Sequence, residues 1–108
     1  MLNFIVTPVA FEELLEVKKR YNEISLRLGQ AFFEDWQNIA DSIQRRPLQS
    51  QIKIKPYRNA FLKRFPYVVV FEVTTMEIIV YRVVHTSRHQ KQRKKRIIFK
   101  KPEIKKKS

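Results

Sequence analysis

The chain has 108 residues, of which 44% are hydrophobic and 12% aromatic, a size and composition that suit one folded domain with a single core. It contains no cysteine, which excludes disulfides, thiolate nucleophiles and cysteine-based zinc sites, and its one glycine excludes a glycine-rich phosphate loop. The 23 Lys and Arg residues against 10 Asp and Glu residues give a net charge of +13, which indicates a polyanionic partner.

The positive charge is concentrated at the C-terminal end. From His85 onward there are 11 basic residues and one acidic residue, Glu103. Nucleic acid, an acidic protein and an anionic membrane surface all fit such a charge, and the final Lys105–Lys107 could simply keep the protein in solution. No stretch reaches the roughly 18 apolar residues of a membrane span, and residues 1–7 lack the basic flank of a signal peptide. We therefore expect a soluble, cytoplasmic protein that does not enter a membrane.

The first half of the chain predicts a strand followed by two helices. Apolar side chains at positions 2, 4 and 6 have the period of two that is typical of a strand. Thr7 and Pro8 then form a typical helix start, with threonine as N-cap and proline in the first turn. Apolar residues at spacings of three and four continue this helix, which we expect to end between Asn22 and Leu26.

The second helix is expected to run from about Leu28 to Arg45, where the following Pro47 stops it. One apolar stripe should face the core and consists of Phe32, Trp36, Ile39 and Ile43. The polar residues of this helix are expected to face elsewhere, and they are Glu34, Asp35, Asn38 and Asp41.

The second half of the chain has the character of a sheet. Residues 52–55 alternate between Ile and Lys, which predicts a half-exposed strand with both lysines on one face. Residues 67–73 and 78–84 are almost continuously apolar and predict two strands inside the sheet, joined through Thr74–Glu77. The order is strand, helix, helix and three strands, an α+β fold. We place the domain at residues 1–96 and a largely disordered basic tail at residues 97–108, where Ile97–Phe99 could add a strand or helical turn.

Three short motifs occur in this order along the chain. Leu28-Gly29-Gln30-Ala31-Phe32 opens the second helix, Tyr57-Arg58 precedes Leu62-Lys63-Arg64-Phe65-Pro66-Tyr67, and Val83-Val84-His85-Thr86-Ser87-Arg88 ends the last strand. They resemble the LG-x-x-F, (K/R)FPY and H-x-x-R signatures of the RelE/ParE superfamily of toxins from type II toxin–antitoxin systems, also known as plasmid stabilisation proteins. The chain departs from the family after Arg88, where many members have a Pro and then a Trp.

The resemblance implies a β-α-α-β-β-β fold with antiparallel strands after the helical hairpin, and it leaves two activities open. RelE-like members cleave messenger RNA on the ribosome without a metal, whereas ParE-like members inhibit DNA gyrase and need no catalytic residues. A non-toxic, basic module that binds nucleic acid or protein is a third reading. The histidine and the basic density favour RNA cleavage slightly.

If the chain cleaves RNA, a base, an acid and cations must act on the scissile phosphate. We expect His85 as the base or acid, because histidine gains and loses protons near neutral pH, and Arg64 and Arg88 as phosphate clamps. The expected RNA-binding residues are Lys53, Lys55, Arg58, Tyr81 and Arg82. No metal and no cofactor is expected.

Each of these residues also has a simpler interpretation. His85 could be a hydrogen-bonded structural residue at the end of a strand, and Arg58 could bridge a strand and a helix. The alternating lysines of residues 52–55 could form a solvated face, and His89 is expected to be solvated within the charge run. The family and the charge together imply an acidic antitoxin partner, whose extended segment would fold over the helices and the sheet edge.

Overall fold

The computed structural model of the protein describes residues 2–89, apart from the side chain of Lys53. Strand β1 (Asn3–Val6) leads directly into helix α1 (Pro8–Ile24). Thr7 is the N-cap of α1, because its side-chain oxygen accepts a hydrogen bond from the backbone N–H of Ala10 at 3.2 Å. The start and the end of this helix are therefore confirmed.

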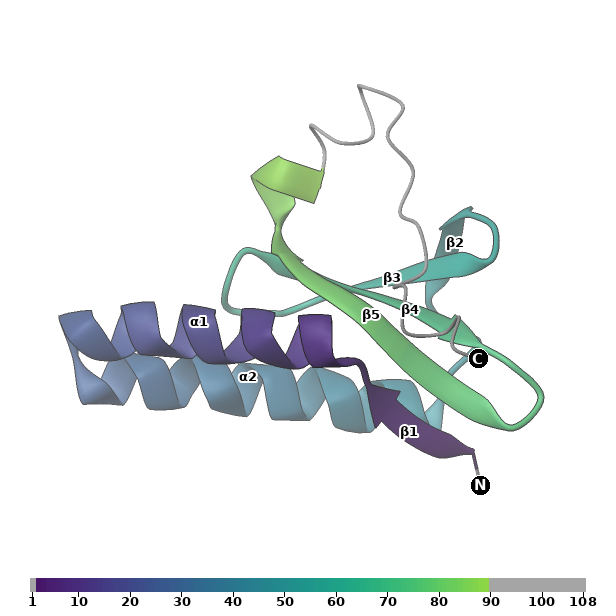
Figure 1. The fold of residues 1–108 in the computed structure, drawn as a ribbon, viewed down its shortest axis with the longest axis horizontal. Coiled ribbons are helices and arrows are strands. Elements are labelled where there is room, and N and C mark those ends of the chain that lie inside the picture. The colour runs from purple at the N-terminus through teal and green to yellow at the C-terminus, as the bar shows by residue number, and fades with distance from the viewer. Residues whose placement is uncertain (1, 90–108) are drawn as a thin grey trace.

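A single residue, Ser25, joins α1 to helix α2 (Leu26–Arg45). Its N–H donates to the carbonyl of Tyr21 at 3.0 Å and its Oγ accepts from the N–H of Leu28 at 3.0 Å, so it ends one helix and caps the next. Because this cap directly follows α1, α2 begins two residues before the predicted Leu28. The joined ends of the helices project beyond the sheet (Figure 1).

The one glycine of the chain lies where the two helices approach each other. A Cβ atom added to Gly29 would stand 1.7 Å from Oδ1 of Asn22 and 3.1 Å from its backbone nitrogen. Because Gly29 has no side chain, Asn22 of α1 can pack against α2 at this point. This close approach explains the glycine of the LG-x-x-F motif.

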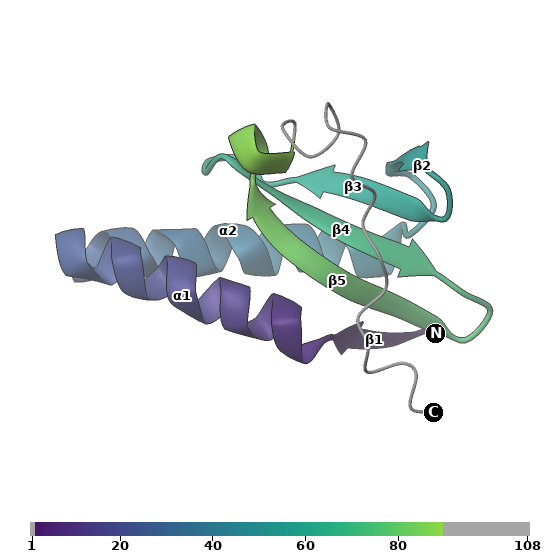
Figure 2. The same cartoon turned by 45° about the horizontal axis from the view of Figure 1, so that its top comes forward.

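The second half of the chain completes a five-stranded sheet in the order β1-β5-β4-β3-β2 (Figures 1 and 2). Its later strands are β2 (Gln51–Ile54), β3 (Tyr57–Phe61), β4 (Tyr67–Val73) and β5 (Glu77–His85). They pair antiparallel to one another, whereas β1 pairs parallel with β5. The α+β fold is confirmed, and β3 is a further strand that the sequence analysis did not predict.

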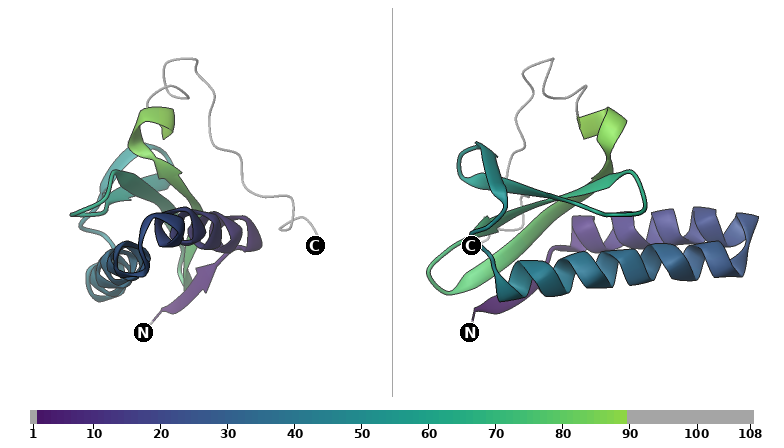
Figure 3. Two further views of the ribbon diagram at one scale, coloured as in Figure 1. Left: turned by 90° about the vertical axis from the view of Figure 1, so that its left-hand side faces the viewer. Right: turned by 180° about the vertical axis from the view of Figure 1, so that it is seen from behind.

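Both helices cover the same face of the sheet (Figure 3). The core between them includes Phe32 and Ala10 from the helices and Val69 and Phe71 from β4, each with 0% of its surface exposed. The predicted inner strands are β4 and β5, and both are largely buried. The predicted connection between them is also confirmed, because the N–H of Thr74 donates to the carbonyl of Glu77 at 2.8 Å.

Four aromatic rings form the centre of the helix-covered face, and they belong to Tyr21, Phe32, Phe65 and Tyr67. Neighbouring ring centroids are 5.0 to 5.7 Å apart, mostly in edge-to-face arrangements. Two of these rings belong to the (K/R)FPY motif and one to the LG-x-x-F motif. These motifs therefore contribute core packing.

Strand β5 ends in a short helical turn of residues 86–89. The predicted domain end at residue 96, the basic tail and the possible strand at Ile97–Phe99 lie outside the described residues. Within residues 2–89, neither helix is long and apolar enough to cross a membrane.

Candidate functional site

The H-x-x-R motif lies at a cleft between α1 and the end of β5. The cleft has a volume of about 440 Å³ and is lined by Glu13, Glu16, Val17, Arg20, Tyr67, Val83, Val84, His85, Ser87 and Arg88. Arg20 and Arg88 are exposed, whereas His85 is half-buried. The sequence predicted His85 and Arg88 for such a site and missed Arg20, which comes from a distant helix and has no motif around it.

His85 is held by contacts on two sides. Its ring packs edge-to-face against Tyr67, with ring centroids 5.2 Å apart. Its Nδ1 accepts a hydrogen bond from the backbone N–H of Ser87 at 3.2 Å and lies 2.9 Å from the hydroxyl of the same serine. A backbone N–H can only donate, so this contact uses Nδ1 as the acceptor and leaves Nε2 as the ring nitrogen that can face a substrate.

Arg64, the other predicted phosphate clamp, does not line the cleft. It lies in the loop between β3 and β4 with its side chain exposed. This loop runs beside the end of β5, because the N–H of Thr86 donates to the carbonyl of Pro66 at 2.9 Å. The structure thus brings His85 and Arg88 to one cleft and leaves Arg64 on a neighbouring loop.

The loop of Arg64 is fixed by Asp35 of α2. The carboxylate of Asp35 accepts backbone hydrogen bonds from Lys63 at 3.3 Å, Arg64 at 2.8 Å and Phe65 at 3.0 Å. Only 3% of the Asp35 surface is exposed. Asp35 was expected to lie off the apolar stripe of α2, and its burial was not predicted; three backbone donors of a loop distant in sequence provide the partners that this burial requires.

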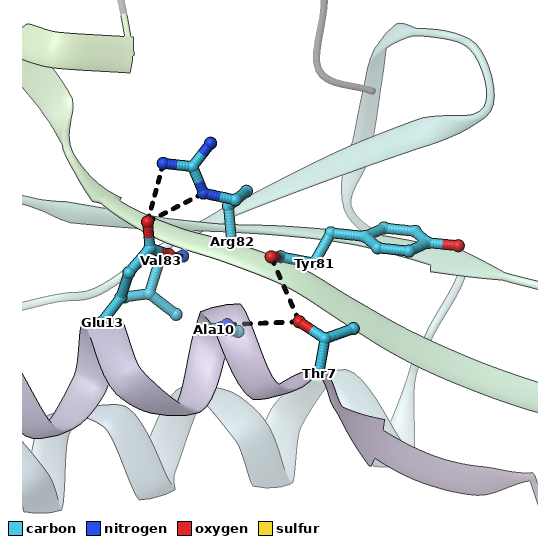
Figure 4. Close-up of polar contacts among 6 residues, drawn as sticks. All are labelled: Thr7, Ala10, Glu13, Tyr81, Arg82 and Val83. Atoms are coloured by element: carbon cyan, nitrogen blue, oxygen red, sulfur yellow. Dashed lines mark hydrogen bonds and ion pairs between the residues drawn. The ribbon is translucent and has the colours of Figure 1, made fainter. Parts of the chain in front are cut away.

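Arg82 is paired within the protein instead of facing solvent alone. Its Nε and Nη2 lie 2.8 and 2.7 Å from Oε2 of Glu13, while Oε1 of the same carboxylate accepts from the N–H of Val83 at 2.7 Å (Figure 4). Strand β1 pairs with β5 only as far as Val80. Glu13 therefore takes the place of a pairing strand beyond that point.

Thr7 makes a second contact between the start of α1 and β5. Its hydroxyl donates to the carbonyl of Tyr81 at 3.4 Å while it caps α1 (Figure 4).

Tyr81 lies on the face of the sheet opposite the helices and is 4% exposed. Its hydroxyl donates to Oε1 of Glu72 at 2.9 Å, and its ring stands perpendicular to that of Tyr57 with centroids 5.8 Å apart. Burial and the hydrogen bond to Glu72 raise the pKa of Tyr81 above its ordinary value. The phenol is therefore held in its neutral, hydrogen-bonded form.

The other predicted RNA-binding residues lie on or beside β3 and β2, the last two strands of the sheet order. The Nη1 of Arg58 donates to the carbonyls of Leu48 at 3.3 Å and Ser50 at 2.8 Å, so this arginine holds the connection between α2 and β2. Lys55 is exposed just after β2, and Lys53 lies within β2.

His89, expected to be solvated, is 4% exposed. Its Nε2 lies 3.2 Å from the side-chain amide nitrogen of Asn59, which is also buried. The expectation is wrong because the turn of residues 86–89 brings this histidine against β3. Among residues 2–89, no three His, Asp or Glu side chains gather in a way that could hold a metal ion.

The fold is similar to that of a solved structure described as the chromosomal ParDE toxin–antitoxin system from P. aeruginosa. The two chains are 18% identical, and the match has a TM-score of 0.61 and covers 79% of this chain and 96% of the other. The family model described as the ParE toxin of the type II toxin–antitoxin system, parDE, matches residues 4–90. The chain therefore belongs to the ParE toxin family. A comparison with curated protein sequences found no match.

Proposed function

We propose that the protein is the toxin of a ParDE-type pair and that it acts by binding DNA gyrase, without cleaving RNA. The observation that carries this proposal is the engagement, within the protein, of three side chains that were expected to bind RNA. Arg58, Tyr81 and Arg82 each bond to another part of the protein. The family assignment supports the same choice, since ParE-like toxins act on gyrase without catalytic residues.

Releasing these side chains for RNA would have a cost. Arg82 faces the carboxylate of Glu13, so its charge is already balanced, and a phosphate placed beside the pair would meet the negative charge of Glu13. The Tyr81 side chain would have to break its hydrogen bond to Glu72 and move out of its buried position before it could stack on a base. A protein-binding role requires neither change.

RNA cleavage is the second candidate, and the cleft at His85 is the observation that favours it. His85 lies there with two exposed arginines, Arg20 and Arg88, whose guanidinium groups match phosphate oxygens in geometry. In this case the proton would be exchanged through Nε2 of His85, because Nδ1 already accepts the N–H of Ser87. Nε2 can act as the acid only in the imidazolium, in which Nδ1 is also protonated and the contact with the N–H of Ser87 is lost.

The antitoxin partner of this toxin is expected to be acidic. The net charge of +13 favours a negatively charged chain, and an extended segment that folds on binding could pair its backbone with an exposed sheet edge. A protein of this kind would neutralise much of the excess charge.

One set of assays separates the candidates. The purified full chain is added to gyrase in a supercoiling assay and to ribosomes carrying a messenger RNA. We expect supercoiling to be inhibited equally by the wild type, His85→Ala and Arg88→Ala, while the messenger RNA stays intact. Arg45→Ala, a change at an exposed residue of α2, is the matched control.

The opposite result would overturn the proposal. Cleavage of the ribosome-bound messenger RNA, lost in His85→Ala and retained in Arg45→Ala, would establish the nuclease. If neither assay responds and expression without the antitoxin leaves growth unchanged, the chain is a basic binding module.

A further inference from the structure

The outer side of α1 has apolar residues that the rest of the described chain leaves about half exposed. Phe11 is 53% exposed and Leu15 is 48% exposed, although both lie in a helix whose other side forms the core. The residues that α1 buries are Ala10, Leu14 and Val17. An exposed apolar stripe on a well-ordered helix is costly in water, which makes it a candidate docking surface.

The exposed residues of α1 follow the spacing of a helix–helix contact. Positions 8, 11, 15 and 18 repeat at intervals of three and four, as the inner positions of a packed helix pair do; the first three are exposed and Lys18 is half-buried. Phe11 and Leu15 occupy two central positions of this stripe. Lys18 contributes its aliphatic stem, with its ammonium group 5.8 Å from the ring centroid of Phe33.

The charges along the stripe are arranged with respect to Leu15. Glu12 lies three residues before it, and Lys18 and Lys19 lie three and four residues after it. A second α1 placed antiparallel across a two-fold axis at Leu15 would bring Glu12 of each copy opposite Lys19 of the other, because these two residues lie on the same flank of Leu15. It would also place Phe11 over the stem of Lys18.

We propose that two copies of this chain associate through the outer sides of their α1 helices, antiparallel and centred on Leu15. The stripe is complementary in charge to a second copy of itself, as a two-fold symmetric interface requires. This complementarity identifies the binding partner as another copy of the chain. A parallel arrangement would place Glu12 beside Glu12 and lysine beside lysine, so the antiparallel pairing is the one that the charges allow.

The contact is small, because α1 has 17 residues and only its outer side takes part. Interfaces of this size are weak, so we expect a dissociation constant in the micromolar range and a dimer that dissociates on dilution. The contact leaves the cleft at His85 open, because the residues of α1 that line the cleft are Glu13, Glu16, Val17 and Arg20.

Sedimentation velocity of the full chain over a concentration series tests the proposal. The wild type should shift from monomer to dimer as its concentration rises through the micromolar range. Leu15→Glu should weaken the association at least tenfold. Leu26→Glu is the matched control, since Leu26 is 75% exposed at the tip of the hairpin, outside the stripe, and the change should leave the association unaltered.

A charge exchange identifies the partner as a second copy in the stated orientation. Glu12→Lys alone and the double change Lys18→Glu with Lys19→Glu should each abolish the dimer, and an equimolar mixture of the two variants should restore it. Circular dichroism confirms that each variant is folded.

Two results would overturn the proposal. One is a wild type that stays monomeric up to several hundred micromolar. The other is a mixture of the charge variants that does not associate although both are folded. If the same variants also lose antitoxin binding, the stripe is an antitoxin surface. The gyrase and ribosome assays are independent of all these outcomes.

Discussion

The two faces of the sheet are stabilised in different ways. The helix-covered face is an apolar core built around four aromatic rings, with Phe32 completely buried. The opposite face uses pairs of polar side chains, Tyr81 with Glu72 and Asn59 with His89. Core burial is worth several kcal/mol per large residue and a neutral hydrogen bond about 1 kcal/mol, so the first face should dominate stability.

The difference between the two faces also shows which parts of the fold the family motifs form. Phe32 of the first motif and Phe65 and Tyr67 of the second lie at the helix-covered face, and Gly29 of the first motif lies between the two helices. The third motif alone reaches a cleft, through His85 and Arg88. A chain can therefore keep the family fold through the first two motifs without keeping a particular activity.

Truncating the helix-covered core should have the largest effect. Phe32→Ala removes a fully buried ring and leaves a cavity, so we expect it to lower the free energy of unfolding by about 3–5 kcal/mol. Phe61→Ala, at a ring that is 50% exposed, should cost far less. Urea denaturation of both variants measures the difference, and equal losses would contradict the assignment of the core to this face.

The carboxylate that holds the Arg64 loop should come next. Asp35→Asn removes the charged acceptor of three backbone N–H groups and places amide hydrogens against buried donors, so we expect a loss of about 3 kcal/mol. Asp41→Asn on the same helix breaks only an exposed ion pair with Arg45 and should cost less than about 1 kcal/mol. A similar stability for the two variants would show that the loop does not depend on Asp35.

A smaller loss is expected where α1 meets the edge of β5. Glu13→Gln weakens the contacts to Arg82 and to the N–H of Val83 and should cost about 1.5 kcal/mol, because the pair is partly exposed. Glu16→Gln, one turn along the same helix at an exposed position, is the control. Hydrogen exchange of the Val83 amide should be faster in Glu13→Gln alone, and unchanged exchange would contradict the role of this carboxylate.

The polar face should show the smallest effect at neutral pH. Tyr81→Phe loses the hydrogen bond to Glu72 and should cost about 1 kcal/mol.

Alkaline pH should reduce the contribution of Tyr81 to the free energy of unfolding. The fold raises the pKa of Tyr81, so the folded protein keeps the phenol proton at a pH where the unfolded chain, with an ordinary value of 10.0, loses it. The contribution is complete below pH 10 and falls above it by up to about 1.4 kcal/mol per pH unit. Urea denaturation at pH 9, 10 and 11 should give a shallower decline for Tyr81→Phe than for the wild type. Identical declines would show that Tyr81 is not held by the fold.

Local signals predicted the elements that local interactions form. The Thr7 cap and the run of apolar positions define α1, and the unbroken apolar residues of β4 and β5 define the inner strands. Strand β3 was missed because its sequence, Tyr57 to Phe61, contains Arg58 and Asn59, which are typical of loops. Their partners lie in the loop before β2 and in the turn after β5.

Only the site residues that belong to a local sequence motif were predicted. His85 and Arg88 are three residues apart and share one cleft, whereas the partners of Asp35 and Arg82 are far away in sequence. Asp35 bonds residues 28 to 30 positions later, and Arg82 pairs with Glu13 across 69 positions. Spacing along one chain contains no signal for such pairs, so the burial of Asp35 and the neutralisation of Arg82 could not be predicted.

The Glu13 contact also has a consequence for how this toxin behaves in the crowded cell. A strand edge with free N–H groups is a template onto which other chains can add, and repeated addition leads to aggregates. At Val83 the N–H is already bonded to a carboxylate, and that negative charge would repel the carbonyl oxygens of an approaching strand. Glu13 thus disfavours the addition of an unrelated strand to this edge of β5. A partner that displaces Glu13, or that binds beside it, could still pair there.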